Sequence, residues 1–453
     1  MSNILPNSLI RKLGANPLFD EQAFIDIHEK GERQSSIRIN EKKITAAPFA
    51  HAEPIPWCDR GFYLEERPSF TLDPLYHAGC YYSQDASSMF ISHIIQHLKL
   101  DGEPLKALDL CAAPGGKATL LNSYLHPQSL LVANEIIKTR VPILMENMVR
   151  WGNSNIVITN NDPSAFKRLP GYFDLVMIDA PCSGSGMFRK DSGAIDEWSE
   201  ANVKLCSERQ QRILAEAMDC LKTDGILLYS TCSYSQEENE DIADWLVKEY
   251  GLKSIQIPVR EEWGIEETKS DISTCFGYRF YPHKVKGEGF FITAFVKTAF
   301  QETFNRKKIK PEKSDVPNGI MEHWLNNAST HTAFLHHENV HIFPKNYETD
   351  LKILQNVLYL KNAGTNIGKL AGKELIPAHG LALSTAIKAD ISTLELTLEE
   401  AQNYLRKENI DPEHSLKNGW TLVTYKNVKL GWIKILANRI NNYYPKESRI
   451  AYL

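Results

Sequence analysis

Two cysteines lie in short polar segments that each follow a predicted buried strand. Cys182 belongs to the segment DAPCSG, which begins at Asp179 after the apolar run 173–178. Cys232 belongs to the segment TCS, after the apolar run 226–230. A single buried cysteine is more often structural, but two at neighbouring strand ends favour nucleophilic catalysis. A thiolate that adds to carbon 6 of cytosine makes carbon 5 nucleophilic enough to take a methyl group, and an acid such as Asp179 would stabilise the adduct. Chemistry alone does not decide which cysteine is the nucleophile.

Methyl transfer needs a bound donor, and the stretch LKALDLCAAPGGK at 105–117 has the pattern of a cofactor-binding turn. The apolar run 105–110 predicts a buried parallel strand, and a helix is predicted to open at Lys117. Between them, small residues let the backbone approach a ligand, and the helix N-terminus offers free N–H groups and a positive dipole end. The residues that we expect to contact the cofactor are Cys111, Ala112, Ala113, Pro114, Gly115, Gly116 and Lys117.

Three ligands compete for this turn, beside the alternative of an ordinary strand-to-helix turn that binds nothing. A P-loop requires G-x-x-x-x-G-K-[ST], but Cys111 replaces the first glycine and Ala118 replaces the Ser or Thr that binds magnesium. The dinucleotide fingerprint G-x-G-x-x-G is absent. The remaining ligand is S-adenosylmethionine, whose amino-acid end a loop of small residues can hold.

Acidic residues follow three of the predicted strands. Glu135 ends the strand predicted over 130–135 and could accept hydrogen bonds from a ribose diol. Asp162 follows the strand predicted over 156–159 and could accept a hydrogen bond from the amino group of adenine. Each acid, taken alone, is more simply explained as a helix N-cap. Together with Asp179 at the end of a third strand, they favour S-adenosylmethionine as the cofactor.

Strand and helix patterns alternate through the region that carries these residues. Helices are predicted over 118–125, 141–151, 200–221 and 235–250, and a late antiparallel strand over 289–297. Repeated β-α units predict an α/β fold with a doubly wound parallel sheet. In such a sheet the ligand lies beyond the carboxyl ends of the strands, where the cysteines and acids are predicted to lie.

Smaller units are predicted on either side of this region. A helix over 18–30 and a strand over 35–40 indicate a small α/β N-terminal domain, and the charged, proline-containing segment 301–317 is typical of a linker. Short alternating segments, such as 340–343, 420–425 and 429–436, indicate a strand-rich C-terminal domain. We therefore divide the chain into an N-terminal domain (1–85), a cofactor-binding domain (86–300), a linker (301–320) and a C-terminal domain (321–453).

The charge of the chain is unevenly distributed. The net charge of −5 does not by itself indicate a nucleic-acid-binding protein, but the last 37 residues contain seven basic residues and one acidic residue. Basic residues can bind phosphates and aromatic rings can stack on bases, so this composition indicates contact with RNA. The alternative is that the basic residues only form the solvated face of a basic β-domain. The aromatic residues interleaved with these cations are Trp420, Tyr425, Trp432, Tyr443 and Tyr444.

Several classes of protein are excluded by composition. No apolar run reaches the ~18–20 residues of a membrane span, and the N-terminus has no apolar core of signal-peptide length. We therefore expect a cytoplasmic protein with no membrane partner. The eight cysteines form no C-x-x-C pair, so we expect free thiols and no metal site.

Motifs throughout the chain match those of a known family. They are LDLCAAPGGKATLL (108–121), NEIIKTR (134–140), DAPCSGSGMFRKD (179–191), YSTCSYSQEENE (229–240) and RFYPHKVKGEGFF (279–291). In these motifs the chain resembles the Nol/Nop/Sun RNA cytosine-5 methyltransferases, and the bacterial RsmF branch in particular. The run PLYHAGCYYSQDASSMF (74–90) resembles the family's N-terminal lead-in, and 418–450 resembles the PUA-like RNA-binding domain of that branch.

The resemblance implies a class I methyltransferase with a Rossmann-like sheet, S-adenosylmethionine as cofactor, and methylation of carbon 5 of cytosine in RNA. In this family the nucleophile is the cysteine of the TCS motif, here Cys232, and the cysteine of the PC motif, here Cys182, assists release of the methylated RNA. Cofactor contacts from the turn and from the three acids are also implied. The implied substrate is small-subunit (16S) ribosomal RNA, free or in an assembling subunit, positioned by the N-terminal domain and the basic tail. Two rival hypotheses remain, a non-catalytic RNA-binding assembly factor and a methyltransferase for another substrate.

Overall fold

The computed structural model describes residues 5–17, 19–304, 316–317, 319–372, 374–408 and 417–451. Much of the predicted linker, 301–320, therefore lies outside the described residues. The N-terminal region forms a small α/β domain, as predicted, with an antiparallel sheet of order β2-β3-β1-β4. Its elements are α1 (Asn7–Leu13), α2 (Glu21–Lys30), β1 (Ser35–Ile39), β2 (Glu53–Ile55), β3 (Cys58–Leu64), α3 (Pro74–His77) and β4 (Tyr81–Ser83).

A ten-stranded mixed sheet runs through the centre of the molecule, in the order β11-β12-β13-β9-β8-β5-β6-β7-β16, with β10 paired to β13. The inner strands β9, β8, β5, β6 and β7 are parallel, which confirms the predicted doubly wound sheet. The chain changes direction across the sheet between β5 and β8, and a ligand crevice forms beyond the strand ends at such a switch point. The strands are β5 (Lys106–Asp109), β6 (Leu130–Asn134), β7 (Ile156–Thr159), β8 (Phe173–Asp179), β9 (Leu221–Thr231), β10 (Leu252–Ser254), β11 (Glu266–Lys269), β12 (Phe276–Phe280), β13 (Phe290–Lys297) and β16 (Leu360–Ala363).

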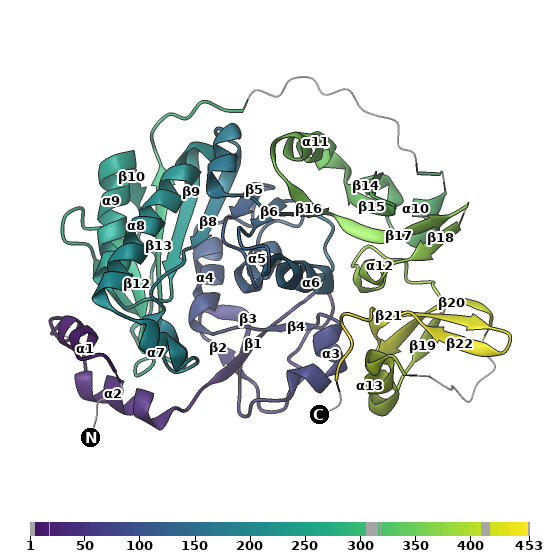
Figure 1. Ribbon diagram of the computed structural model, residues 1–453, viewed down its shortest axis with the longest axis horizontal. Helices are drawn as coiled ribbons and strands as arrows, with labels where there is room; N and C mark the ends of the chain where they lie inside the picture. Colours follow the sequence, from purple (N-terminus) through teal and green to yellow (C-terminus); the bar gives the residue numbers. More distant parts are fainter. Residues whose placement is uncertain are drawn as a thin grey trace.

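Helices cover both faces of the central sheet (Figure 1). On one face, α4, α5 and α6 contribute core residues such as Phe90 and Leu144. On the other, α8, α9 and α11 contribute residues such as Leu214 and Leu354. The inner strands are therefore buried on both sides, which explains their nearly continuous apolar sequences. The helices are α4 (Phe90–His97), α5 (Gly116–Tyr124), α6 (Val141–Trp151), α7 (Gly193–Glu197), α8 (Glu200–Ala217), α9 (Glu240–Tyr250) and α11 (Glu348–Val357).

Two helices are shorter than their sequences predict. The helix predicted over 200–221 ends at Ala217, because Leu221 already belongs to β9 and pairs with Phe173 of β8. The helix predicted over 235–250 begins at Glu240, because Asn239 before it has a non-helical backbone (φ −120°, ψ −91°). Both differences arise where the chain enters or leaves β9, so pairing within the sheet overrides the local helical preference. The predictions for α6 and β7 are confirmed to the residue.

The C-terminal region adds a strand and a helix to the central sheet, which the sequence did not indicate. β16 pairs antiparallel with the edge strand β7, and α11 packs on the adjacent face. The rest of the region is strand-rich, as predicted, with sheets β14-β15-β17-β18 and β19-β20-β21-β22. Its elements are α10 (Ile320–Trp324), β14 (His331–His336), β15 (Asn339–Pro344), β17 (Thr365–Ala371), β18 (Glu374–Pro377), α12 (His379–Leu383), β19 (Thr393–Glu395), α13 (Leu398–Arg406), β20 (Gly419–Tyr425), β21 (Val428–Leu436) and β22 (Arg439–Asn442).

The last sheet packs against the N-terminal domain. Figure 1 shows α3 beside α13 and β21, and these elements are in contact. One hydrophobic core contains Ile39 and Leu75 of the N-terminal domain together with Ile433 of β21. Gln402 of α13 donates a hydrogen bond to the carbonyl of Leu72 at 3.0 Å. The first and last parts of the chain therefore share one core. In the ranges given above, no helix is long and apolar enough to cross a membrane.

Candidate active site

The two cysteines predicted from the sequence lie side by side at the carboxyl edge of the central sheet. β8 and β9 are adjacent parallel strands, and their register places Asp179 opposite Ser230. Cys182 and Cys232 follow these residues within three positions, and their Sγ atoms lie 3.0 Å apart. Both side chains are half-buried. The folded chain thus brings together the pair that was predicted from the strand ends.

An ion pair lies close to the two sulfur atoms. Lys117 Nζ is 2.7 Å from Asp179 Oδ2, and the hydroxyl of Ser230 donates to Asp179 Oδ1 at 2.7 Å. Burial disfavours the charge of Lys117, but the attraction and hydrogen bond of Asp179, together with the charges of Cys232 and Asp109, outweigh burial and raise the pKa of Lys117. The hydrogen bond with Cys232, followed by burial, raises the pKa of Cys182 well above its ordinary value. Cys182 is therefore a thiol that can donate a hydrogen bond to Cys232.

The predicted cofactor turn joins β5 to α5 and is held in place by β6 and α6. Gly115 has a φ of +117°, and a side chain at this position would meet Asn147 Cβ at 3.3 Å. Asn147 Nδ2 donates to the carbonyl of Pro114 at 2.7 Å. The amide of Ala112 donates to the carbonyl of Asn134 at 2.8 Å. The turn is therefore fixed from outside, while the first amide groups of α5 have no partner within the helix.

The other two predicted acids, Glu135 and Asp162, lie in different surroundings. Glu135 directly follows β6, is 2% exposed, and accepts the amide of Ile137 at Oε1 (2.8 Å). In the described part of the chain its buried Oε2 accepts no hydrogen bond, although Arg140 Nη1 lies 3.4 Å away. Asp162 is exposed, and hydrogen bonds from the hydroxyl and amide of Ser164 lower its pKa. Asp162 caps the short helix after β7, so the alternative role as an N-cap is present as well.

Two cavities open at this edge of the sheet. One of about 520 Å³ is lined by Glu135, Asp162 and both cysteines. The other, of about 270 Å³, is lined by the turn and by residues 82–85 of the N-terminal domain. Asp179 and Cys232 line both cavities, so they lie where two bound molecules would meet.

The groups around the 520 Å³ cavity fit S-adenosylmethionine. The buried Oε2 of Glu135, which accepts no hydrogen bond within the described residues, can accept one from a ribose diol. Gly116 and Lys117, at the start of α5, line the adjoining cavity of about 270 Å³, and amides at a helix N-terminus can bind a carboxylate. The volume lies in the usual range for cofactor pockets, ~300–1,000 Å³. A resident metal has no comparable donor set, because the described side chains form no group of three His, Cys, Asp or Glu that could hold one.

Two buried acids near the site were not indicated as functional by the sequence. Asp109 ends β5, and neither of its carboxylate oxygens accepts a well-aligned hydrogen bond within the described ranges. Burial, and then repulsion by Asp179, raises the pKa of Asp109 to about 7. Glu238 accepts hydrogen bonds from Ser183 and Ser233. Asp109 could have been found from its place at a strand end, whereas Glu238 has no local signal because Ser183 is distant in sequence.

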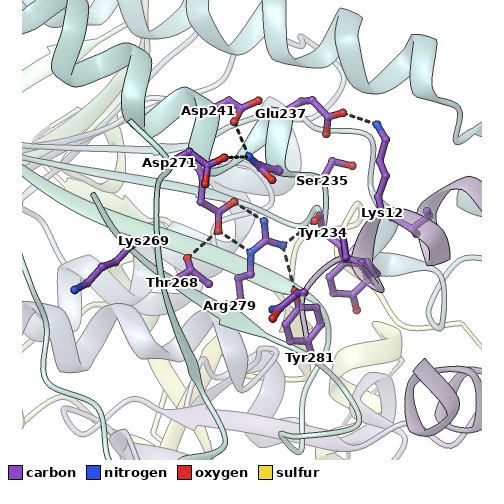
Figure 2. Close-up of a pocket in the computed structure, with 16 residues that line it drawn as sticks. Lys12, Tyr234, Ser235, Glu237, Asp241, Thr268, Lys269, Asp271, Arg279 and Tyr281 are labelled. Carbon is purple, nitrogen blue, oxygen red and sulfur yellow. Dashed lines mark hydrogen bonds and ion pairs between the residues drawn. The ribbon is translucent and has the colours of Figure 1, made fainter. Parts of the chain in front are cut away.

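A separate cavity of about 620 Å³ contains none of the predicted site residues (Figure 2). It lies between α1 and the segment 234–241, which follows the Cys232 loop. Arg279 pairs with Glu240. Figure 2 shows Arg279 beside Tyr234, to whose carbonyl it donates a hydrogen bond, and Lys12 of α1 reaching Glu237. Because these charges are paired with one another, we interpret the cavity as a junction between α1 and the central sheet.

The sheet, its switch point and the cofactor edge define the class of the protein, a class I methyltransferase with a Rossmann-like fold. Solved structures have the same architecture. NSun6 from Pyrococcus horikoshii, solved with SFG, is 19% identical with a TM-score of 0.54 and covers 66% of this chain and 100% of its own. A methyltransferase homologue from Pyrococcus horikoshii is 26% identical with a TM-score of 0.52, over 65% of this chain and 100% of its own.

Sequence comparison identifies the family within this class. Residues 96–296 match the profile described as 16S rRNA methyltransferase RsmB/F, 5–86 the N-terminal domain of 16S rRNA methyltransferase RsmF, and 391–450 the methyltransferase RsmF PUA domain. The ribosomal RNA small subunit methyltransferase F of Aliivibrio fischeri is 31% identical over 437 residues, 91% of this chain and 90% of the relative. The chain belongs to the RsmF family of methyltransferases, and it is an enzyme that uses S-adenosylmethionine.

Proposed function

We propose that this enzyme methylates carbon 5 of cytosine in RNA, and that the RNA is 16S ribosomal RNA of the small subunit. The observation that carries the proposal is the pair of sulfur atoms 3.0 Å apart where two cavities meet. Methyl transfer to a basic nitrogen or an oxygen needs no sulfur nucleophile, whereas carbon 5 of cytosine must be activated by one. The similarity to a family of 16S rRNA methyltransferases and to a ribosomal RNA small subunit methyltransferase supports ribosomal RNA as the substrate.

The cavity of about 520 Å³ is the proposed place of the cofactor. S-adenosylmethionine supplies an activated methyl group. Glu135 would bind the ribose diol, Asp162 would lie toward the adenine amine, and Asp179 would face both cofactor and base. The turn would hold the amino-acid part through Cys111, Ala112, Ala113, Pro114, Gly115, Gly116 and Lys117.

The cavity of about 270 Å³ is the proposed place of the target cytosine, which must leave its stack to reach the cysteines. Phe290 lines this cavity, and Lys117 Nζ lies 5.4 Å from the centre of its ring. Residues 82–85 close it from the N-terminal domain. The base would therefore be bound between the two domains, with its ring against an aromatic side chain.

Cys232 is the proposed nucleophile. Its thiolate forms a bond to carbon 6, and the electron pair of the 5,6 double bond becomes available at carbon 5. Carbon 5 would take the methyl group, while the bond between that methyl group and the sulfonium sulfur of the donor breaks and the electron pair stays on that sulfur. Asp179 would stabilise the adduct at nitrogen 3 and the amino group of the base. Loss of the carbon 5 proton to a base then restores the double bond, while the bond from carbon 6 to sulfur breaks.

Cys182 is the proposed group for release of the methylated RNA. Because its pKa is raised, Cys182 is a thiol when the adduct breaks down. From 3.0 Å it can donate a hydrogen bond to Cys232 Sγ as negative charge returns to that atom. A donor already in place lowers the energy of the leaving thiolate without further rearrangement.

We also propose that the regions 1–85 and 321–453 position the RNA on the catalytic region 86–300, with 301–320 as the linker. The core shared by the N-terminal domain and the last sheet supports this division of roles, because it joins these two parts of the chain. The basic residues of the last 37 positions remain at least partly exposed, as phosphate contacts require. A ribosomal RNA substrate agrees with a cytoplasmic enzyme.

Bisulfite sequencing of 16S rRNA from a strain that lacks the gene tests the proposal. We expect one cytosine that resists conversion in the parent strain to become convertible in the deletion strain. The wild-type gene should restore resistance, and Cys232→Ala should not. An unchanged methylation pattern would contradict cytosine in 16S rRNA as the target, and restoration by Cys232→Ala would contradict the nucleophile.

A further inference from the structure

One buried carboxylate connects the loops that carry the two cysteines. Glu238 lies in the short 3-10 helix after β9, and its side chain is fully buried. Its Oε2 accepts the hydroxyls of Ser183 and Ser233, each at 2.5 Å. Its Oε1 accepts the amide of Ser183 at 2.8 Å and Gln210 Nε2 at 3.2 Å. The carboxylate is thus bonded to both loops and, through Gln210, to α8.

We infer that Glu238 is a positioning residue that sets the distance and orientation of the two cysteine sulfurs. Ser183 and Ser233 directly follow Cys182 and Cys232 in the chain, so each hydrogen bond acts one residue from a sulfur. β8 and β9 end before these positions, so side-chain bonds complete the register that the strands begin. The inference rests on the proposed function of the cysteine pair and adds the group that positions it.

A carboxylate suits these four donors better than an amide does. Both of its oxygens only accept, and its neighbours are an amide N–H, a glutamine NH₂ and two hydroxyls. Hydrogen bonds to a charged acceptor are short and strong, which agrees with the contacts of 2.5 Å. A glutamine at 238 would turn its NH₂ toward one pair of these groups and widen the contacts toward ~2.9 Å.

Glu238→Gln should therefore reduce methyl transfer without weakening cofactor binding. We expect kcat to fall about 10- to 100-fold, because a small displacement of a nucleophile has an effect of this size. KM for RNA and Kd for S-adenosylmethionine should stay within about twofold, since Glu238 lines neither cavity. Single-turnover kinetics with 16S rRNA and calorimetry with S-adenosylmethionine measure these quantities.

Glu237→Gln is the matched control, because the same substitution falls on the preceding residue. Glu237 is partly exposed, pairs with Lys12 of α1 (Figure 2), and lines neither of the two cavities at the cysteines. This variant should keep kcat within about twofold.

Ser233→Ala should reproduce part of the loss, and adding it to Glu238→Gln should cause little further loss, because both changes remove the same bond. If the substitutions only destabilised the fold, the melting temperature would fall and the losses of kcat in the two single variants would add up in the double variant.

Alkylation by iodoacetamide, followed by mass spectrometry, measures the positions of the thiols without methyl transfer. The ratio of labelling at Cys182 to that at Cys232 should change by about threefold or more in Glu238→Gln. An unchanged ratio together with normal kcat in the folded variant would overturn the inference.

If Glu238→Gln does not fold, the combined Ser183→Ala and Ser233→Ala variant removes the same hydroxyl bonds, and an unchanged ratio there would overturn the inference equally. If Cys232→Ala remains active while Glu238→Gln shifts the ratio, the proposed function fails and the positioning role stands.

Discussion

Two regions of this protein carry dense functional signals in the sequence, and they behave differently in the folded chain. At the carboxyl edge of the central sheet, most of the predicted turn, the three acids and both cysteines line two adjoining cavities. In the last 37 residues the cations stay at the surface, but the aromatic residues separate. Trp432 and Tyr444 are 1% and 2% exposed, which contradicts a role in stacking on RNA. Trp420 and Tyr443 remain together at the surface, with ring centres 4.5 Å apart.

The difference follows from the geometry of the two sheets. Parallel strands end at the same level, so the residues that follow them meet whatever their separation in sequence. In an antiparallel sheet successive side chains point to opposite faces, and here both faces of β21 are covered. Ile433 packs toward the N-terminal domain, while Trp432 contacts Trp324 and donates to the carbonyl of Ala378 at 3.0 Å. A motif at the end of a parallel strand therefore predicts which residues lie close together. The composition of the tail predicts its charge but not which of its aromatic residues are exposed.

The largest effect that we predict separates the two cysteines at the catalytic edge. Cys182→Ala should reduce turnover at least about a hundredfold, because the adduct forms but breaks down slowly. A protein–RNA adduct should then accumulate on a denaturing gel. The combined Cys182→Ala and Cys232→Ala variant should show no adduct. Free methylated RNA produced at the normal rate by Cys182→Ala would contradict the release role.

Trp432→Ala tests whether this aromatic residue of the tail belongs to the core. We expect the free energy of unfolding to fall by about 3–5 kcal/mol, because a large buried side chain leaves a cavity. Urea denaturation measures the change. Trp420→Ala, at the partly exposed position on the adjacent strand, should cost clearly less. A small effect of Trp432→Ala would restore the stacking interpretation.

Asp109→Asn tests the buried acid at the catalytic edge through pH. The folded-state pKa of Asp109 is raised to about 7 from 3.8, so the folded chain binds the extra proton between these values. The contribution of Asp109 to stability is therefore lost as pH rises from about 4 to about 7. We expect the advantage of Asp109→Asn over wild type to be about 2–3 kcal/mol larger at pH 8 than at pH 5. Urea denaturation at the two pH values measures it, and equal differences would contradict the raised pKa.

Glu135→Gln tests the cofactor part of the catalytic edge. Replacing the buried carboxylate should weaken S-adenosylmethionine about tenfold, which is the usual effect of losing a hydrogen bond to a charged group. Isothermal calorimetry measures the affinity. Asp162→Asn is the comparison, and because Asp162 is exposed we expect a change of about threefold or less. Equal losses in both variants would show that burial does not distinguish the two acids.

The smallest predicted effect concerns the aromatic pair that remains at the surface of the tail. Tyr443→Ala should weaken binding of a 16S rRNA fragment about fivefold, close to the loss of one stacking contact. Filter binding at fixed salt measures it. The melting temperature should not change, since Tyr443 is 39% exposed. Unchanged affinity would leave the tail with phosphate contacts alone.

Much of the site was predicted from the sequence because its signals are local. Apolar runs between 105 and 230 define parallel strands, and the residues directly after each run must lie at one edge of the sheet. Cys182, Cys232 and Glu135 could be placed in this way before any contact was known. The switch point between β5 and β8 follows from the same alternation of strands and helices.

The tertiary structure alone decided the features that join distant segments. β16 extends the sheet although it follows its partner β7 by about 200 residues in the sequence. Trp432 is buried because the neighbouring units cover its face of β21, and Glu238 connects two cysteine loops through serines that no local pattern relates to it. The residues at the catalytic edge could be predicted without a structure, because strand periodicity and short motifs act over a few residues. Burial and long-range hydrogen bonds were decided only when these segments packed together.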